Sequence, residues 1–386
     1  MKILLFEPFL IKGENLGGDA KKLVQLAEDL EKQGHSYEII TENVGPMSSW
    51  QNYHIIKSIF KYKKGDYTGD VILSSGTPFW GALTGLVRKK LGIPAIFYLT
   101  HINYPKSNFY NVLKLNFFNI IYPSKNFFRN IDNTLFEVFH AVFDGLKTKK
   151  FFLKKLNYVD KVIASCEYLK NYIKPVYNKK VQICYPGIKE IPEKDLPENK
   201  LDDEVKFLYF GALDLRRGPL KIINIARKLK SSKFKILAWP EYFPATKDLI
   251  KRIIKRYQIR NVELLGYCDD FPGEFAKVNF VLLPYLYTNY MPPLVLLEAM
   301  SMRRPIITTD VGANSEFITD QESGFIIDTK NTNKQSQQIQ KIIKNNNTEK
   351  LTRIADRAAE IVKDKCDWQK FSNNFKYEIE KIVSTK

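Results

Sequence analysis

Strand-like apolar runs alternate with helix-like segments along this chain, and the alternation starts twice. Residues 2–8 form a short apolar run, residues 13–18 a loop with glycines, and residues 35–41 a second strand-like run. Between the loop and the second run, leucines recur at the three- and four-residue spacing of a helix. A strand, a glycine loop, a helix and a strand in this order open a doubly wound parallel sheet. Further strand-like runs lie at 71–74, 95–100, 161–164 and 181–185.

The segment 188–204 interrupts this alternation. It is acidic, contains prolines and has few large apolar residues, which is typical of a linker. After it the pattern begins again, with strand-like runs at 207–210, 234–238, 262–265, 280–284, 305–308 and 324–327. A polar, low-complexity patch at 331–347 is expected to separate this second sheet from a final helical region. We therefore predict an α/β chain with two Rossmann-like domains, 1–187 and 205–365, a linker at 188–204 and a C-terminal helix at 366–386 that packs back on the first domain.

Composition narrows the class of protein. A length of 386 residues suits two domains. The net charge of +18 would attract anionic partners, although a lysine- and asparagine-rich proteome would produce the same excess. The 4 cysteines show neither CxxC pairs nor metal-ligand spacing, so we expect no zinc site, no disulfide framework and a cytoplasmic location. The N-terminus lacks a cleavage site and no long apolar run follows, so we expect neither a signal peptide nor a membrane span.

Three segments in the second half of the chain resemble the sequence motifs of a known family. They are FLYFGALDLRRGPLKIINIARKL, NVELLGYCDDFPGEFAKVNFVLLPY and LLEAMSMRRPIITTDVGANSEFITDQESGFII, and CDWQKF follows near the end. In amino-acid sequence and in order along the chain, these segments resemble motifs of the retaining glycosyltransferases of family 4, also called glycosyl transferases group 1. The resemblance implies a GT-B fold, in which two Rossmann-like domains face a cleft. It also implies transfer of a hexose from a nucleotide diphosphate sugar to a glycan or lipid-linked acceptor, with retention of configuration.

Glu298 is the strongest candidate for binding the nucleotide. The run 280–284 ends at a proline, and Pro292 and Pro293 stand where a helix can begin. Glu298 then falls within about two turns of that helix start, at the carboxyl edge of a parallel sheet where ligands bind. A carboxylate there can accept hydrogen bonds from a ribose diol, while the helix N-terminus faces the phosphates. The alternative is that Glu298 is an ordinary solvated helix residue.

The segment that precedes this helix departs from the family pattern. Where the family has a second glutamate followed by Gly-Phe-Gly, this chain has Tyr290, Met291, Pro292 and Pro293. Prolines have no amide hydrogen to donate to the sugar or the phosphate. The amides of Met291 and Leu294 remain as candidate donors. We therefore predict that the contacts with the donor sugar differ from those of the family.

A second departure follows the run 207–210. The resemblance implies two cationic side chains that bind the donor diphosphate. Ala212, directly after Gly211, occupies the position of the first cation, and Arg217, directly before Gly218, occupies the position of the second. An arginine can bind a phosphate through two parallel hydrogen bonds. Arg216 is the candidate to replace the missing cation. The alternative for Arg217 is a loop arginine in solvent.

Other candidate residues come from the first domain and from the turn near Glu316. Gly17 and Gly18 resemble the family's glycine pair, whose backbone approaches the diphosphate or the acceptor; a plain turn is the alternative. His101 ends a strand-like run where the family carries a histidine that contacts the transferring sugar, although a lone histidine is more often a packed one. Glu316 is expected to bond backbone or to order a loop near the donor.

The segment 104–157 is rich in phenylalanine, and lysines cluster at its end. Aromatic residues with a basic rim suit a helix that lies on an anionic membrane surface, which would make the enzyme peripheral on the inner face of a membrane. The alternative is an ordinary core with a charged edge. No nucleic-acid-binding motif accompanies the charge.

The sequence therefore predicts a glycosyltransferase with Arg217, Glu298 and His101 in the catalytic roles. No D-x-D pair occurs, so we expect neither a metal ion nor a cofactor beside the nucleotide sugar. The altered Tyr290 motif and Ala212 leave open a non-catalytic GT-B subunit that binds a partner transferase. A nucleotide-sugar epimerase, which shares the fold, is a weaker alternative because the chain lacks the several carboxylates and histidines that such enzymes use.

Overall fold

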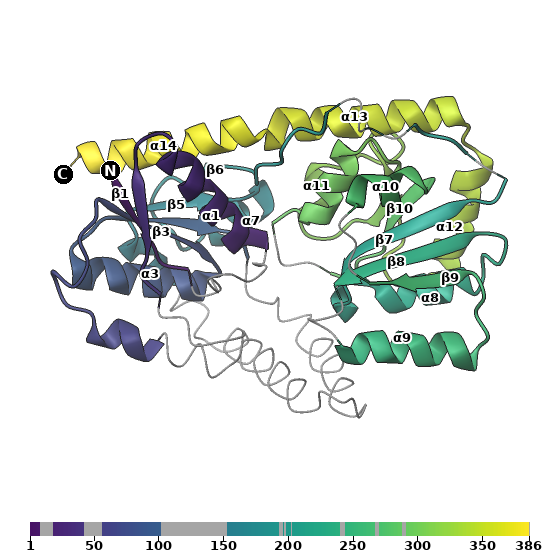
Figure 1. Cartoon of the computed structure of the whole chain (residues 1–386), viewed down its shortest axis with the longest axis horizontal. Coiled ribbons are helices and arrows are strands. Elements are labelled where there is room, and N and C mark those ends of the chain that lie inside the picture. The colour runs from purple at the N-terminus through teal and green to yellow at the C-terminus, as the bar shows by residue number, and fades with distance from the viewer. Residues whose placement is uncertain are drawn as a thin grey trace.

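The computed structural model describes residues 1–7, 18–41, 56–101, 153–192, 196, 198–201, 203–239, 244–266, 270–287 and 291–385. Within these ranges the chain forms two lobes, each built on a six-stranded sheet (Figure 1). The segment predicted to contact a membrane lies outside the described residues up to position 152. Among the residues described, no helix has the length and the apolar character needed to cross a membrane.

The first sheet has the strand order β2-β1-β3-β4-β5-β6, and every neighbouring pair is parallel. β3 and β4 are buried along their whole length, as expected for central strands covered on both faces. Helices α1, α3 and α7 connect the strands. The bounds are β1 Lys2–Leu5, α1 Gly18–Glu31, β2 Ser36–Ile39, β3 Val71–Gly76, α3 Pro78–Leu91, β4 Ala95–Leu99, β5 Lys161–Ala164, α7 Glu167–Ile173 and β6 Gln182–Ile183.

The second sheet has the order β12-β11-β10-β7-β8-β9 and is also parallel throughout. Its bounds are β7 Lys206–Ala212, α8 Pro219–Ala226, β8 Lys233–Trp239, α9 Pro244–Arg256, β9 Val262–Leu265, α10 Phe271–Ala276, β10 Phe280–Leu283, α11 Leu294–Ser301, β11 Ile306–Thr309 and β12 Phe325–Ile327. β6 and β7 lie on either side of the predicted linker 188–204. The predicted α/β class, with two doubly wound parallel sheets, is confirmed.

The polar patch 331–347 lies between β12 and the last two helices, as predicted, and it is itself mostly a helix. Helix α12 spans Thr332–Lys344, and the side chain of Asn331 caps it by accepting from the amides of Asn333 and Lys334. Ile339 is fully buried on the inner face, with Ile342 half-buried beside it. The few apolar residues all lie on one helical face, so composition alone conceals the helix.

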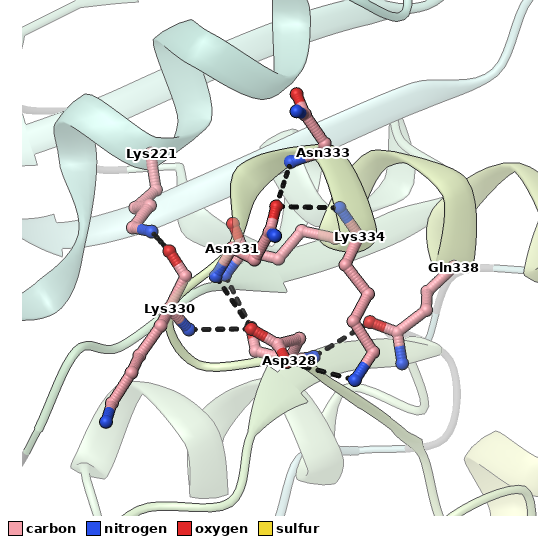
Figure 2. A network of polar contacts seen from close by, with 8 residues as sticks. Lys221, Asp328, Lys330, Asn331, Asn333, Lys334 and Gln338 are labelled. Carbon is pink, nitrogen blue, oxygen red and sulfur yellow. Dashed lines mark hydrogen bonds and ion pairs between the residues drawn. The ribbon is translucent and has the colours of Figure 1, made fainter.

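A network around Asp328 fixes the start of α12 (Figure 2). The Asp328 carboxylate accepts from the amides of Lys330 and Asn331 at 2.8 and 2.7 Å and pairs with the Lys334 ammonium at 3.2 Å. The Lys221 side chain, on α8, donates to the carbonyl of Lys330. The amides of Asn331 and Lys330, together with Lys334, lower the pKa of Asp328 to about 2. The network therefore ties α12 to α8 and depends on the ionised carboxylate.

The two helices at the end of the chain run along both lobes (Figure 1). α13, Thr348–Cys366, packs on α11, and α14, Trp368–Ser384, packs on α1 and β3 of the first lobe. The rings of Phe371 and Phe375 lie edge-on to Tyr98, with centroids 5.9 and 5.2 Å away. The indole of Trp368 donates to Asp29 at 2.6 Å. α14 is thus part of the core of the first lobe although it is the last helix of the chain.

Candidate functional site

The carboxyl ends of β7 and β10 define the centre of the candidate site. β7 is the first strand of the second sheet; β8 and β9 continue on one side of it, and β10, β11 and β12 on the other. The strand order therefore reverses between β7 and β10. In doubly wound sheets, ligands bind at this switch point, beyond the carboxyl ends of the strands. The loop after β7 carries Arg217, and the segment after β10 leads to α11 and Glu298.

The loop after β7 is shaped by two glycines in left-handed conformations. Gly211 has φ +127°, and a Cβ there would lie 3.3 Å from Nη1 of Arg217, so the Arg217 guanidinium lies against this glycine. Gly218 has φ +77°, and a Cβ there would approach the carbonyl oxygen of Pro284 to 2.1 Å. Both positions therefore require glycine. Gly218 allows the loop after β7 to pack directly on the end of β10.

Arg216 and Arg217 have different environments. The Arg216 guanidinium bonds Asp214 at 2.6 Å, and the side chains of this pair are only 11% and 8% exposed. Burial raises the pKa of Asp214 to about 6, against the charge of Arg217 and the amide of Arg216. Arg216 is thus engaged inside its own loop in this structure. Its predicted role as a replacement cation for the diphosphate stays a prediction.

Glu298 is half-buried on α11. This helix begins at Leu294, directly after the N-cap residue Pro293. Burial raises the pKa of Glu298, while the charges of Lys22 and Lys21 on α1 of the first lobe lower it. Among the residues that the structure describes, none donates a hydrogen bond to its carboxylate. A desolvated carboxylate at the switch point is suited to accept hydrogen bonds from a ligand.

Tyr285 is a site residue that the sequence reasoning missed. It follows Pro284 directly after β10 and is 2% exposed, and its hydroxyl has no hydrogen-bond partner among the described residues. Burial raises the pKa of Tyr285 to about 12; the charge of Arg217 opposes this, and Glu298 adds to it. The ring therefore lies in the electrostatic field of both predicted nucleotide-binding residues. Its place at the end of β10 was the signal that could have found it.

The first lobe contributes the other side of the site through the end of β4. Nδ1 of His101 lies 2.8 Å from the hydroxyl of Thr100, and the carbonyl of Thr100 accepts from the amide of Met291 at 2.7 Å. Met291 is 4% exposed and packs into the core cluster of the first lobe. The structure therefore brings His101 and the start of the α11 segment together. The amide of Met291 donates to Thr100 in this structure, whereas the sequence analysis named it as a candidate for a hydrogen bond to the donor sugar or phosphate.

Glu316 joins the lobes beside this site. Its carboxylate accepts from the amides of Glu167 and Tyr168 at 2.9 and 2.7 Å and from the hydroxyl of Tyr185 at 3.0 Å. Both amides belong to the first turn of α7, whose N-cap residue Cys166 supplies no side-chain cap. The prediction that Glu316 bonds backbone is confirmed, and the backbone is that of the other lobe.

The remaining predicted residues are placed only in part. Gly18 begins α1, whereas Gly17 and Tyr290 lie outside the described residues. Leu294 is partly buried and packs against the core clusters of both lobes. Within the described ranges, no three His, Cys, Asp or Glu side chains gather so that they could hold a metal ion.

Comparisons with known proteins show what this chain is similar to. The family model described as glycosyl transferases group 1 matches residues 204–345, which contain both Arg217 and Glu298. An uncharacterized glycosyltransferase of Methanocaldococcus jannaschii is 23% identical over 229 residues, which are 59% of this chain and 61% of that protein. The chain thus spans less than two thirds of the length of this curated relative.

Solved structures match nearly the whole chain. The sucrose-phosphate synthase of Thermosynechococcus elongatus has a TM-score of 0.71 at 15% identity, covering 100% of this chain and 99% of that one. HepE of Anabaena, in complex with UDP, has a TM-score of 0.65 at 15% identity, covering 99% and 100%. The fold of this chain is therefore GT-B. Its second lobe contains the residues 204–345 that are similar to the glycosyl transferases group 1 model, the family that the sequence resemblance named.

Proposed function

We propose that this protein is a glycosyltransferase that moves a hexose from a nucleotide diphosphate sugar to a glycan or lipid-linked acceptor. The observation that carries the proposal is the convergence of Arg217 and Glu298 on the switch point of the second sheet, inside the segment that matches the family. The UDP complex of the similar HepE structure supports a nucleotide as part of the donor.

In the proposed reaction, the bond between the anomeric carbon and the diphosphate oxygen breaks, and a bond to the acceptor hydroxyl oxygen forms. The acceptor's proton leaves with the departing diphosphate. Arg217 would neutralise the charge that develops on the diphosphate, and the N-terminal amides of α11 would add their dipole. Glu298 would accept hydrogen bonds from the ribose hydroxyls, and His101 would contact the sugar in transfer. Retention of configuration is proposed on the family resemblance.

Sugar recognition would differ from the family pattern at the start of α11. Pro292 and Pro293 have no amide hydrogen, and the amide of Met291 donates to Thr100 in this structure. The amide of Leu294 would then be the first on this segment to face the donor. Side chains, rather than a row of backbone amides, would select the sugar.

We propose that the reaction needs no divalent metal, since the diphosphate would be balanced by Arg217 and by helix amides. Turnover should persist in EDTA. If EDTA abolished turnover and added Mg²⁺ or Mn²⁺ restored it, this part of the proposal would be wrong.

The acceptor class and a membrane surface contacted through 104–157 are proposals from the sequence. Co-sedimentation with anionic and neutral liposomes tests the contact with a membrane surface.

A thermal-shift panel of UDP, GDP and ADP compounds, with and without sugars, tests the nucleotide assignment. A ligand that binds only the folded state raises the melting temperature, and about 100-fold saturation stabilises by roughly 2.7 kcal/mol. We expect one base to raise it and Glu298→Gln to reduce the shift. Ala212 and the two prolines favour one rival, a non-catalytic subunit. No shift with any compound would favour that rival.

A further inference from the structure

Lysines gather at the amino-terminal edge of the first sheet. Helix α3 connects the carboxyl end of β3 to the amino end of β4, so its last turn lies at this edge. The residues 56–64, 154–158 and 174–180 precede β3, β5 and β6, which places them at the same edge. We call the following at least partly exposed lysines the basic edge: Lys57, Lys61, Lys63, Lys64, Lys89, Lys90, Lys154, Lys155, Lys174, Lys179 and Lys180.

The residues 56–64 pack against the end of α3. The Lys90 ammonium, in the last turn of this helix, donates to the carbonyl of Phe60 at 2.8 Å. Gly92 caps the helix, and a Cβ added there would lie 3.7 Å from the side chain of Lys64. The lysines of 56–64 and those of α3 therefore belong to one surface.

The stretches before β5 and β6 continue this surface. A Cβ added to Gly85 of α3 would lie 2.8 Å from the Cβ of Tyr158, so the stretch before β5 packs directly on the helix. The Lys179 ammonium donates to the carbonyl of Val159 at 2.7 Å, which joins the stretch before β6 to the stretch before β5. The basic edge is thus a single face built from four separate parts of the chain.

Acidic side chains offset little of the charge of this face. Asp160 forms two hydrogen bonds with the guanidinium of Arg88 on α3, at 2.5 and 2.6 Å, so these two charges neutralise each other. Asp66 and Asp70 lie in the loop before β3, and Asp70 accepts from the amide of Lys2 at 2.7 Å. A large part of the net charge of +18 is therefore gathered at one edge of the first lobe, where it attracts anionic partners.

Two aromatic rings project from the same face. Phe60 is 65% exposed and Tyr158 is 51% exposed. The Lys155 ammonium donates to the Tyr158 hydroxyl at 2.9 Å and lies 4.6 Å from the centroid of its ring. An exposed ring alone has little meaning, but aromatic rings within a lysine-rich face are the combination that attaches proteins to an anionic bilayer.

The kind of cation favours a bilayer over a nucleic acid as the partner. Apart from Arg88, which Asp160 engages, the cations of these stretches are lysines. Arginine binds individual phosphates and base edges through pairs of parallel hydrogen bonds. Lysine acts as a point charge on a flexible stem, which suits a diffuse layer of anionic headgroups.

We propose that the basic edge binds the surface of an anionic phospholipid bilayer, with its lysines at the headgroups and with Phe60 and Tyr158 inserted between them. The inference rests on the membrane contact proposed for 104–157 and extends it, because Lys154 and Lys155 are described residues of that segment. The candidate site faces the carboxyl ends of the strands. Docking through the amino-terminal edge of the first sheet would therefore leave the site uncovered.

Co-sedimentation with phosphatidylcholine vesicles that contain about 30% phosphatidylserine tests this. The variants are Lys61→Glu/Lys89→Glu, Phe60→Ser and, as a control, Lys341→Glu/Lys344→Glu. The control pair is exposed in the last turn of α12, which lies at the opposite end of the molecule from α3 (Figure 1). It therefore makes the same change of net charge away from the basic edge.

We expect wild type to bind and Lys61→Glu/Lys89→Glu to bind at least about 25-fold more weakly, since each lysine near an anionic surface contributes about fivefold. Phe60→Ser should weaken binding about 5- to 10-fold, because apolar area buried in the interface adds to the attraction. The control should change binding less than about threefold, since charges farther away than the screening length of about 10 Å are shielded.

Two measurements on wild type stand even if a variant fails to fold. Salt at about 1 M should release the protein from the vesicles, because the screening length falls to about 3 Å. Vesicles of phosphatidylcholine alone should bind at least about 25-fold more weakly than the anionic ones. Equal binding to neutral and anionic vesicles would overturn the assignment to the lysines.

The outcomes also separate this inference from the other proposals. Unchanged vesicle binding in Lys61→Glu/Lys89→Glu overturns this inference and leaves a contact through 104–157 standing, whereas an equal loss in the control shows that net charge alone attracts the bilayer. A single-stranded oligonucleotide that binds more tightly than the vesicles, and loses affinity in Lys61→Glu/Lys89→Glu, would replace the bilayer as the partner. If wild type ignores anionic vesicles, both membrane proposals fail. Nucleotide affinity in solution should be equal in wild type and Lys61→Glu/Lys89→Glu, so glycosyl transfer is tested separately.

Discussion

Replacing Glu316 by alanine should loosen the contact between the lobes. Its carboxylate accepts three hydrogen bonds, two from the first turn of α7 and one from Tyr185. Burial and the nearby Glu316 raise the pKa of Tyr185, so its hydroxyl stays a donor. A hydrogen bond to a charged group contributes about 1.5–3 kcal/mol, and loss of an N-terminal cap costs about 1 kcal/mol. With Glu316 half-exposed to water, we expect Glu316→Ala to lower the free energy of unfolding by about 3 kcal/mol.

Scanning calorimetry measures this change. An unfolding entropy near 2.1 cal/mol/K per residue gives roughly 0.8 kcal/mol/K for 386 residues unfolding together, so the melting temperature should fall by about 4 °C. Glu316→Gln keeps one acceptor oxygen and should lose about half as much. The exposed Glu322, six residues on, provides the control Glu322→Ala, which should leave the melting temperature unchanged. A shift below 1 °C in Glu316→Ala would refute the assignment of these contacts to the lobe interface.

Three other predictions concern the second lobe. Tyr285→Phe removes a buried hydroxyl that has no partner among the described residues, so denaturant unfolding should show a gain of about 1 kcal/mol; a comparable loss would mean that the hydroxyl is bonded. Gly218→Ala forces a left-handed φ and a clash with the carbonyl of Pro284, so we expect a loss of at least about 2 kcal/mol and weaker nucleotide binding, whereas an unchanged melting temperature would contradict the described turn. The folded-state pKa of Asp328 is depressed to about 2, so its contribution to stability is complete above about pH 4 and is lost as pH falls toward 2. Far-ultraviolet circular dichroism should therefore show a smaller acid-induced loss of stability in Asp328→Asn than in wild type.

Much of the fold could be predicted because parallel strands buried on both faces leave long apolar runs. β4 and β10 are such runs, and the two-sheet prediction followed from the alternation of strand-like and helix-like segments that begins again after 188–204. The helix α12 within 331–347 was not predicted because it buries only a narrow apolar face. Its cap by Asn331 was a readable signal, since asparagine is a favoured N-cap residue.

The site could be predicted only where one segment contains the signal. Glu298 and Arg217 each follow a strand of the second sheet at a recognisable position. Contacts between the lobes depend on the relative placement of distant segments, which no local pattern encodes. Lys22 and Glu298 are far apart in the sequence, as are Glu316 and the start of α7, so their relationships came only from the structure. Tyr285 was missed because an apolar ring after a proline resembles an ordinary core residue.

Release of nucleoside diphosphate from a nucleotide sugar tests the central claim most directly. Wild type and Glu298→Gln would be incubated with UDP-, GDP- and ADP-sugars and an extract containing glycan and lipid-linked acceptors, with Glu322→Gln as the control. The account predicts acceptor-dependent release by wild type and by the control, and a kcat/KM about 100-fold lower in Glu298→Gln, equivalent to roughly 2.7 kcal/mol. Equal rates in wild type and Glu298→Gln, or no release by wild type from any of the three donor classes, would contradict it.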